Sequence, residues 1–168
     1  MGTRHNVVFL GPEYKYKDDD GKEQKMNKLK FNANGKINLT CIKNAPKVYV
    51  HWDGYPSGAL PILKDFLNTD GAKHRLNDEQ YLSAYYIAYK IIHDFGKTNL
   101  KELDDFASIG IEPKLNDWCD FTYIIQPETV DASYSKPVIY VLDYNYKLIQ
   151  KIENINNLEK YIDEEWWY

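Results

Sequence analysis

Arginine and cysteine are scarce in this chain of 168 residues. Only Arg4 and Arg75 are arginines among 21 basic residues, and only Cys41 and Cys119 are cysteines. Because a guanidinium group suits bidentate phosphate contacts better than an ammonium group does, so few arginines argue against a nucleic-acid-binding surface. The two cysteines form no C-x-x-C pair, and we interpret both as free thiols in β-strands of a protein from a reducing cytoplasm.

Long apolar runs and common cofactor motifs are also missing. No apolar stretch approaches the length of a membrane-spanning helix, and the first residues lack the charged-then-apolar order of a signal peptide. We therefore expect a soluble, cytoplasmic protein that does not contact a membrane. The chain has no Gly-Lys-Ser/Thr phosphate loop and no G-x-G-x-x-G motif, and its four histidines are scattered. We expect neither a metal nor a cofactor.

Length and charge favour one domain with an uneven charge distribution. A chain of this length with 43% hydrophobic residues buries about two thirds of its unfolded surface. Residues 1–50 hold ten basic and five acidic residues, whereas residues 51–168 hold eleven and twenty, which gives a net charge of −4. A basic patch near the N-terminal strands is therefore an alternative to a solvated lysine-rich hairpin.

The kind of basic residue points to the origin of the gene. Nineteen of the 21 basic residues are lysine, and asparagine, isoleucine and tyrosine are abundant, as in proteins encoded by A/T-rich codons. This composition indicates a phage, a large DNA virus or a bacterium of low G+C content.

Hydrophobic patterning predicts strands at both ends of the chain. Strands are expected over residues 3–10, 29–31, 37–41 and 47–51, and again over 121–125, 138–142 and 147–152. The Asn34-Gly35 dipeptide favours a tight turn, so the strands beside it should pair and the first fifty residues should form a meander. The polar stretch through Asp18 and Gly21 is interpreted as a loop or hairpin tip.

Helical spacing replaces the strand pattern after residue 58. A first helix ends near Asn68, a second runs from an N-cap at Asn77 to Gly96, and residues 98–107 form a short third helix. Apolar residues nearly circle the second helix. We therefore expect it to be buried on more than one side, or to present one side to a partner.

These elements predict a single α+β domain with a mainly antiparallel sheet. The N-terminal strands occupy residues 1–51, the helices are inserted at 58–107, and the C-terminal strands occupy 118–168 together with a short helix that starts at Asn156 or Asn157.

The segment from His51 to Gly58 is the best candidate for a functional site. It joins a predicted strand to a predicted helix, so it combines turn glycines, aromatic rings, a carboxylate and an imidazole with the free N–H groups of a helix start. With Arg4, the candidate ligand-binding residues are Arg4, His51, Trp52, Asp53, Tyr55, Ser57 and Gly58. The alternative is that Asp-Gly and Pro-Ser-Gly only form the turn.

Two other functions remain open. The first is a small hydrolase or nucleotide-processing enzyme in which His51 acts with Asp53 or His5. The second is a structural or virion-associated protein, a homo-oligomer with its tyrosines and the Trp166-Trp167-Tyr168 end at a subunit interface.

Two separated motifs carry a resemblance. Met1-Gly2-Thr3-Arg4 and His51-Trp52-Asp53-Gly54-Tyr55-Pro56-Ser57-Gly58 resemble a family of small phage, large-virus and bacterial proteins, in which a Thr-Arg opening precedes a His-aromatic-Asp-x-Tyr-Pro-x-Gly segment. The resemblance covers chiefly the first seventy residues and implies a mobile-element origin but no particular activity. Residues 11–46 are longer here than in that family.

Together these features favour a non-enzymatic binding protein of phage or viral type. We expect it to contact a host protein or a small anionic ligand through Arg4 and the segment 51–58, with counter-defence as a role that fits such an origin.

Overall fold

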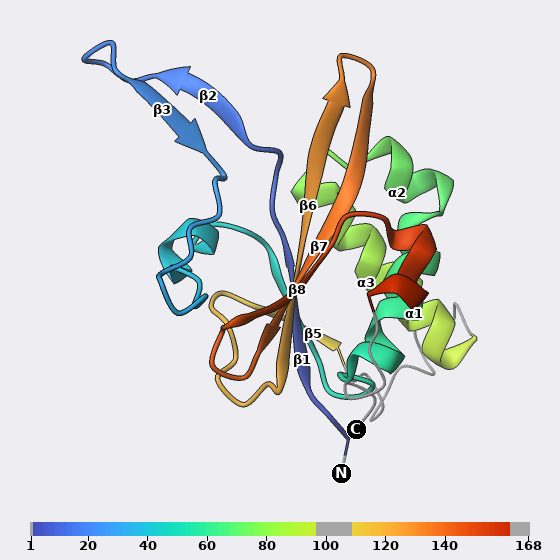
Figure 1. The fold of residues 1–168 in the computed structure, drawn as a ribbon. Helices are drawn as coiled ribbons and strands as arrows, with labels where there is room; N and C mark the ends of the chain where they lie inside the picture. Colours follow the sequence, from blue (N-terminus) through green and yellow to red (C-terminus); the bar gives the residue numbers. More distant parts are fainter. Residues whose placement is uncertain (1, 97–108, 162–168) are drawn as a thin grey trace.

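A six-stranded sheet forms the centre of the protein, which Figure 1 shows as a computed structural model that describes residues 2–96 and 109–161. The strands in chain order are β1 (His5–Phe9), β2 (Tyr14–Lys17), β3 (Glu23–Met26), β4 (Lys47–Val50), β5 (Ile109–Glu112), β6 (Phe121–Asp131), β7 (Tyr134–Asp143) and β8 (Leu148–Ile152). The sheet order is β5-β4-β1-β6-β7-β8, and β2 pairs only with β3. Since only β1 and β6 run parallel, the predicted α+β class with a mainly antiparallel sheet is confirmed.

Helices cover one face of this sheet (Figure 1). They are α1 (Pro56–Leu67), α2 (Asp70–His74) and α3 (Glu79–Phe95), which all lie between β4 and β5 in the chain. Two short 3-10 helices, η1 (Leu39–Ile42) and η3 (Ile155–Lys160), complete the described elements. The helices are therefore inserted between N-terminal and C-terminal strands, as the sequence predicted.

Strand alternation divides the apolar residues into two cores. In β1, Val7 and Phe9 face the helices, whereas Val8 faces the other side. The larger core lies under the helices and includes Leu63, Phe66 and Tyr86 among others. The smaller core is covered by the connection from β3 to β4, which contributes Ile37 and Ile42.

The predicted pairing around the Asn34-Gly35 turn is confirmed, but the continuous N-terminal meander is wrong. Phe31 and Ile37 form an antiparallel bridge, and the amides of Asn32 and Asn38 donate to the carbonyls of Lys36 and Lys30 at 2.8 and 2.7 Å. Leu39–Ile42 forms η1 instead of a strand, because the side chain of Asn38 accepts a hydrogen bond from the Thr40 amide and caps a helical turn. β1 then pairs with β4 on one side and with β6 on the other.

Helix boundaries differ from the prediction by one or two residues. The N-cap of α3 is Asp78, whose carboxylate accepts from the Tyr81 amide, and not Asn77. Gly96 ends α3 in the left-handed conformation, as predicted. The last helix is a 3-10 turn capped by Asn154. The expected helix over 98–107 and the Trp166-Trp167-Tyr168 end lie outside the described residues.

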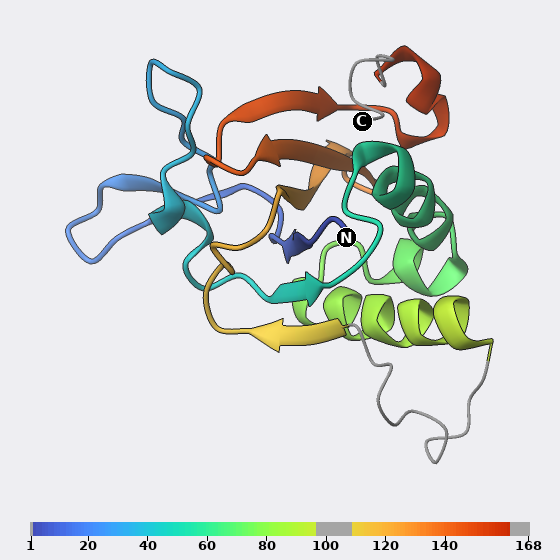
Figure 2. The same cartoon turned by 90° about the horizontal axis from the view of Figure 1, so that it is seen from below.

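A two-stranded arm extends from the body of the protein. β2 and β3 pair around a turn at Asp18, whose carboxylate accepts from the amides of Asp20 and Lys22. Every residue of both strands is exposed. Figure 2 shows the arm on the opposite side of the molecule from the helices, next to the connection from β3 to β4.

Candidate functional site

The segment 51–58 forms a corner at one end of the sheet. It leaves β4 after Val50, turns beside the first residues of β1, and enters α1 at Pro56. Two of its aromatic side chains are exposed, Trp52 by 49% and Tyr55 by 41%. We refer to Arg4, His51, Trp52, Asp53 and Tyr55 as the aromatic corner.

Gly54 anchors the corner to the sheet. Its amide donates to the Thr3 carbonyl at 2.9 Å, and the buried Tyr123 hydroxyl donates to its carbonyl oxygen at 2.7 Å. A Cβ at Gly54 would lie 2.6 Å from the Thr3 carbonyl oxygen, so no larger residue fits without a backbone shift. Asp53 holds a positive φ of 58°, which costs a non-glycine residue free energy. The turn is therefore rigid and specific.

His51 and Trp52 form one aromatic unit. The Tyr49 hydroxyl and the His51 Nδ1 atom lie 2.7 Å apart, at hydrogen-bond distance. The Trp52 ring stands edge-on to the imidazole with a centroid distance of 4.4 Å, and it also covers the backbone of Gly2. Held on two sides, the indole presents its remaining half to solvent.

Arg4 enters the corner from β1. Its amide donates to the Asp120 carboxylate at 3.2 Å, and its carbonyl accepts from the Asp120 amide at 2.9 Å, which ties the start of β1 to the start of β6. Burial raises the pKa of Tyr49 and the positive charge of Arg4 opposes that rise. The positive charge of Arg4 therefore reaches Tyr49.

Tyr55 completes the corner on the helix side. Its ring packs against Phe121 at a centroid distance of 5.9 Å, while its backbone caps α1 without a side-chain hydrogen bond. The structure thus places the five residues of the aromatic corner at the same end of the sheet, with His51 beside Tyr49 on one face and Tyr55 beside Phe121 on the helix side.

The two remaining residues, Ser57 and Gly58, do not form an open anion site. α1 begins at Pro56, earlier than predicted, so its first residue has no N–H group to donate. The Gly58 amide already donates to the Tyr55 carbonyl at 2.9 Å. A Cβ at Gly58 would lie 3.3 Å from the Asp53 Cβ, so the Asp53 side chain is beside this helix start and its negative charge would oppose a bound anion.

Catalytic groups do not converge at the corner. His5 is buried on the helix side of β1, where its ring meets Tyr123 edge-on, whereas His51 contacts Tyr49 on the other side of the sheet. Burial, then the negative charge of Asp120, raises the pKa of the Cys119 thiol to about 12, so this thiol is protonated at neutral pH. The geometry therefore separates His5 from His51, so these two imidazoles form no acid–base pair.

Sequence reasoning missed two residues near the corner. Tyr49 precedes His51 by two positions, so strand alternation places both on one face and could have revealed the pair. Trp118 is 78% exposed and stands two residues before Asp120, yet no local pattern distinguishes it from a core tryptophan. Its exposure follows from the turn at Asn116, whose side chain accepts from the Trp118 amide.

Neither a metal-binding cluster nor a membrane-spanning helix occurs among the described residues. Across residues 2–96 and 109–161, no three His, Cys, Asp or Glu side chains gather closely enough to hold a metal ion. In the same residues, no helix combines the length and apolar character needed to cross a membrane. Comparison with family models, curated proteins and solved structures found no match to this chain. The family resemblance therefore stays a prediction, and function must be argued from the geometry.

Proposed function

We propose that this chain is a non-enzymatic binding protein of phage or viral type and that a host protein docks on the aromatic corner. The observation that carries the proposal is the pair of half-exposed rings, Trp52 and Tyr55, on a turn held by buried hydrogen bonds of Gly54. Aromatic and arginine side chains dominate the binding energy of protein interfaces. Rigid anchors also lose little conformational entropy when a partner binds.

A protein partner fits the corner better than a small anion does. The carboxylate of Asp53 and the missing N–H of Pro56 weaken the helix start as an anion site. The half-exposed rings of Trp52 and Tyr55 supply apolar anchors, and Arg4 and His51 supply polar groups, the combination found at the centre and rim of an interface. The separation of His5 and His51 on opposite faces of the sheet argues against an acid–base pair of these two imidazoles and favours binding.

The viral origin and the role in counter-defence belong to the same proposal. Their support is the composition, in which lysine exceeds arginine by nineteen to two, and the two N-terminal motifs. A host protein is the partner class that such an origin favours.

Affinity capture with a matched control tests the proposal. Immobilised protein is incubated with lysate of a low-G+C bacterium, and retained proteins are identified by mass spectrometry. We expect Trp52→Ala and Arg4→Ala to reduce retention of a specific protein by at least about tenfold, since interface aromatics and arginines commonly contribute this much.

The control is Tyr144→Ala, which removes an aromatic ring that is 68% exposed in the turn between β7 and β8. This variant should retain the partner fully. Melting temperatures of all three variants should stay close to that of the parent, because no buried contact of the two cores is lost. Equal retention by Trp52→Ala and the parent protein, or unfolding of the variants, would remove the corner as a docking site.

A further inference from the structure

A second site lies at the base of the arm, on the side of the connection from β3 to β4. A cavity of about 300 Å³ opens there, a volume at the lower end of the range for small-ligand sites. The residues that line it are Leu10, Gly11, Lys25, Met26, Asn27, Lys28, Lys30, Thr40, Cys41, Asn44, Ala45 and Glu79. None of them belongs to the aromatic corner, so this site is independent of the proposed function.

Positive charge concentrates around this cavity. Residues 24–52 contain six lysines and no acidic residue. Three of the lysines, Lys25, Lys28 and Lys30, stand on the cavity wall. Lys25 is paired with Glu13 at 3.5 Å, whereas Lys28 and Lys30 have no ion pair with a described residue. The cavity therefore offers two lysines without an ion pair, with the side-chain amide of Asn44 as a further hydrogen-bond donor, whereas the Thr40 hydroxyl already donates to the Asn38 side chain at 2.6 Å.

Buried contacts hold the cavity wall in place. The side chain of Gln126, which is 7% exposed, donates to the carbonyls of Gly11 and Asn27 at 3.1 and 2.7 Å. Asn27 adopts a positive φ of 59° and donates to the Pro12 carbonyl at 3.1 Å. These bonds fix the bend from which Lys28 and Lys30 leave the arm, so their backbone positions are set before any ligand binds.

The opposite wall is fixed in a similar way. Lys47 is buried and its ammonium group donates to the carbonyls of Lys43 and Ala45 at 3.1 and 2.8 Å. This holds the backbone on both sides of Asn44. Lys47 is thus used by the fold, while Lys28 and Lys30 remain available to a ligand.

One carboxylate modifies the selectivity of the cavity. Glu79, in the first turn of α3, lies so close to Gly11 that a Cβ there would be 2.9 Å from its Oε2 atom. It is the one acidic residue among those lining the cavity. It repels a phosphate placed beside it but can accept a hydrogen bond from a ligand hydroxyl group.

We infer that the cavity at the base of the arm binds a small ligand carrying one or two phosphate groups, through Lys28 and Lys30 with Asn44. Ammonium groups act as point charges toward phosphate, which suits a compact ligand. The small volume and the scarcity of arginine favour such a ligand over a nucleic-acid strand.

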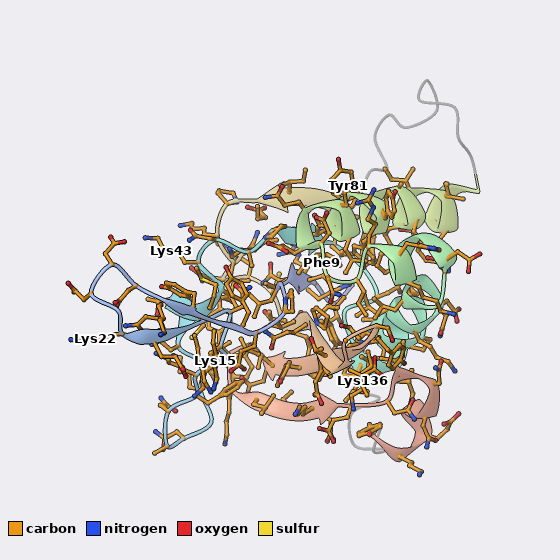
Figure 3. The ribbon with its side chains drawn as sticks, turned by 90° about the horizontal axis from the view of Figure 1, so that it is seen from above. Phe9, Lys15, Lys22, Lys43, Tyr81 and Lys136 are labelled. Atoms are coloured by element: carbon orange, nitrogen blue, oxygen red, sulfur yellow. The ribbon has the colours of Figure 1, made fainter. Side chains whose placement is uncertain are left out.

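Pyrophosphate is the probe, and amide chemical shifts of the ¹⁵N-labelled full chain are the readout at low ionic strength, where charge interactions are least screened. We expect saturable shifts in residues 25–30 and 40–45. The double variant Lys28→Gln/Lys30→Gln should raise the dissociation constant at least about tenfold, because each removed charge loses a charge-assisted contact. The matched control is Lys36→Gln/Lys43→Gln, which removes two exposed lysines of the same acid-free segment that do not line the cavity. This control should change the dissociation constant by less than about threefold. Lys43 is visible beside the arm in Figure 3.

A third variant, Glu79→Gln, separates a specific cavity from a loss of folding. It should bind pyrophosphate more tightly than the parent does, because the carboxylate no longer repels it. Both outcomes of a comparison with ADP support the proposal: tighter binding of ADP than of pyrophosphate would identify a nucleotide ligand, and equal or weaker binding of ADP would identify a ligand recognised by its phosphate groups alone. Equal weakening by both lysine pairs, shifts centred on the arm tip near Lys22, or binding of a single-stranded oligonucleotide without pyrophosphate would overturn it.

Discussion

The fold strongly alters the protonation of His5. Burial on the helix side of β1, followed by the charge of Lys90, lowers its pKa from 6.5 to about 3. The folded protein therefore keeps this imidazole neutral, while the unfolded chain takes up a proton below pH 6.5. Its contribution to stability is complete above pH 6.5 and is lost as the pH falls from there toward 3.

We predict a loss of unfolding free energy of at most about 1.4 kcal/mol for each pH unit in this window from His5 alone. Urea unfolding at pH 7, 6, 5 and 4 measures it. His5→Phe keeps an aromatic ring, removes the buried Nδ1 atom that has no hydrogen-bond partner, and should flatten the curve. The control His74→Phe changes an exposed ring and should leave the slope intact. Identical slopes for the parent and His5→Phe would contradict the prediction.

At the scale of elements, the sequence pattern and the structure assign the N-cap of α3 to different residues. The capping-box spacing predicts Asn77, whereas in the folded protein the Asp78 carboxylate accepts a hydrogen bond from the Tyr81 amide. Asp78→Ala should therefore lower the unfolding free energy by about 1 kcal/mol, and Asn77→Ala by much less. Thermal and urea unfolding of the two variants check this. A larger loss in Asn77→Ala would show that the helix begins one residue earlier.

A helix or strand could be predicted from the sequence where a single local pattern determines its secondary structure. α3 follows its 3.6-residue period to Gly96, and the strands of 121–125 and 138–142 follow from runs of β-branched and aromatic residues. β5 was missed because Ile109–Glu112 is short and contains a glycine. The η1 turn was missed because the Asn38 cap competes locally with strand alternation.

At the scale of the whole molecule, long-range contacts decided what could be predicted of the sheet and the corner. The parallel pairing of β1 with β6 joins residues more than 100 positions apart, and no local pattern signals it. That pairing brings Asp120 to Arg4 and Tyr123 to Gly54. The turn at residues 51–58 was foreseen, but its attachment to the rest of the fold was not.

At the same scale, we expect the arm to be less stable than the body of the protein. β2 and β3 contact each other but neither core, their residues are all exposed, and their ion pair of Lys15 with Glu23 at 3.3 Å is solvated. Figure 3 shows Lys15 and Lys22 along this arm and Phe9 inside the body. Because an isolated two-stranded hairpin is marginally stable in water, the arm should open without global unfolding.

Hydrogen exchange measures this difference. Arm amides of residues 15–25 should exchange through local opening, with protection well below that of β1, β6 and β7, and their rates should respond little to low urea concentrations. Core amides such as those of Val8 and Ile124 should exchange only through global unfolding. The destabilising variant Asp78→Ala provides the control, because it should speed exchange in the core while leaving the arm unchanged. If the exchange rates of the arm amides instead changed together with those of the core, the arm and the body would form a single cooperative unit. The exposed strands of the arm and their lack of residues in either core argue against that result.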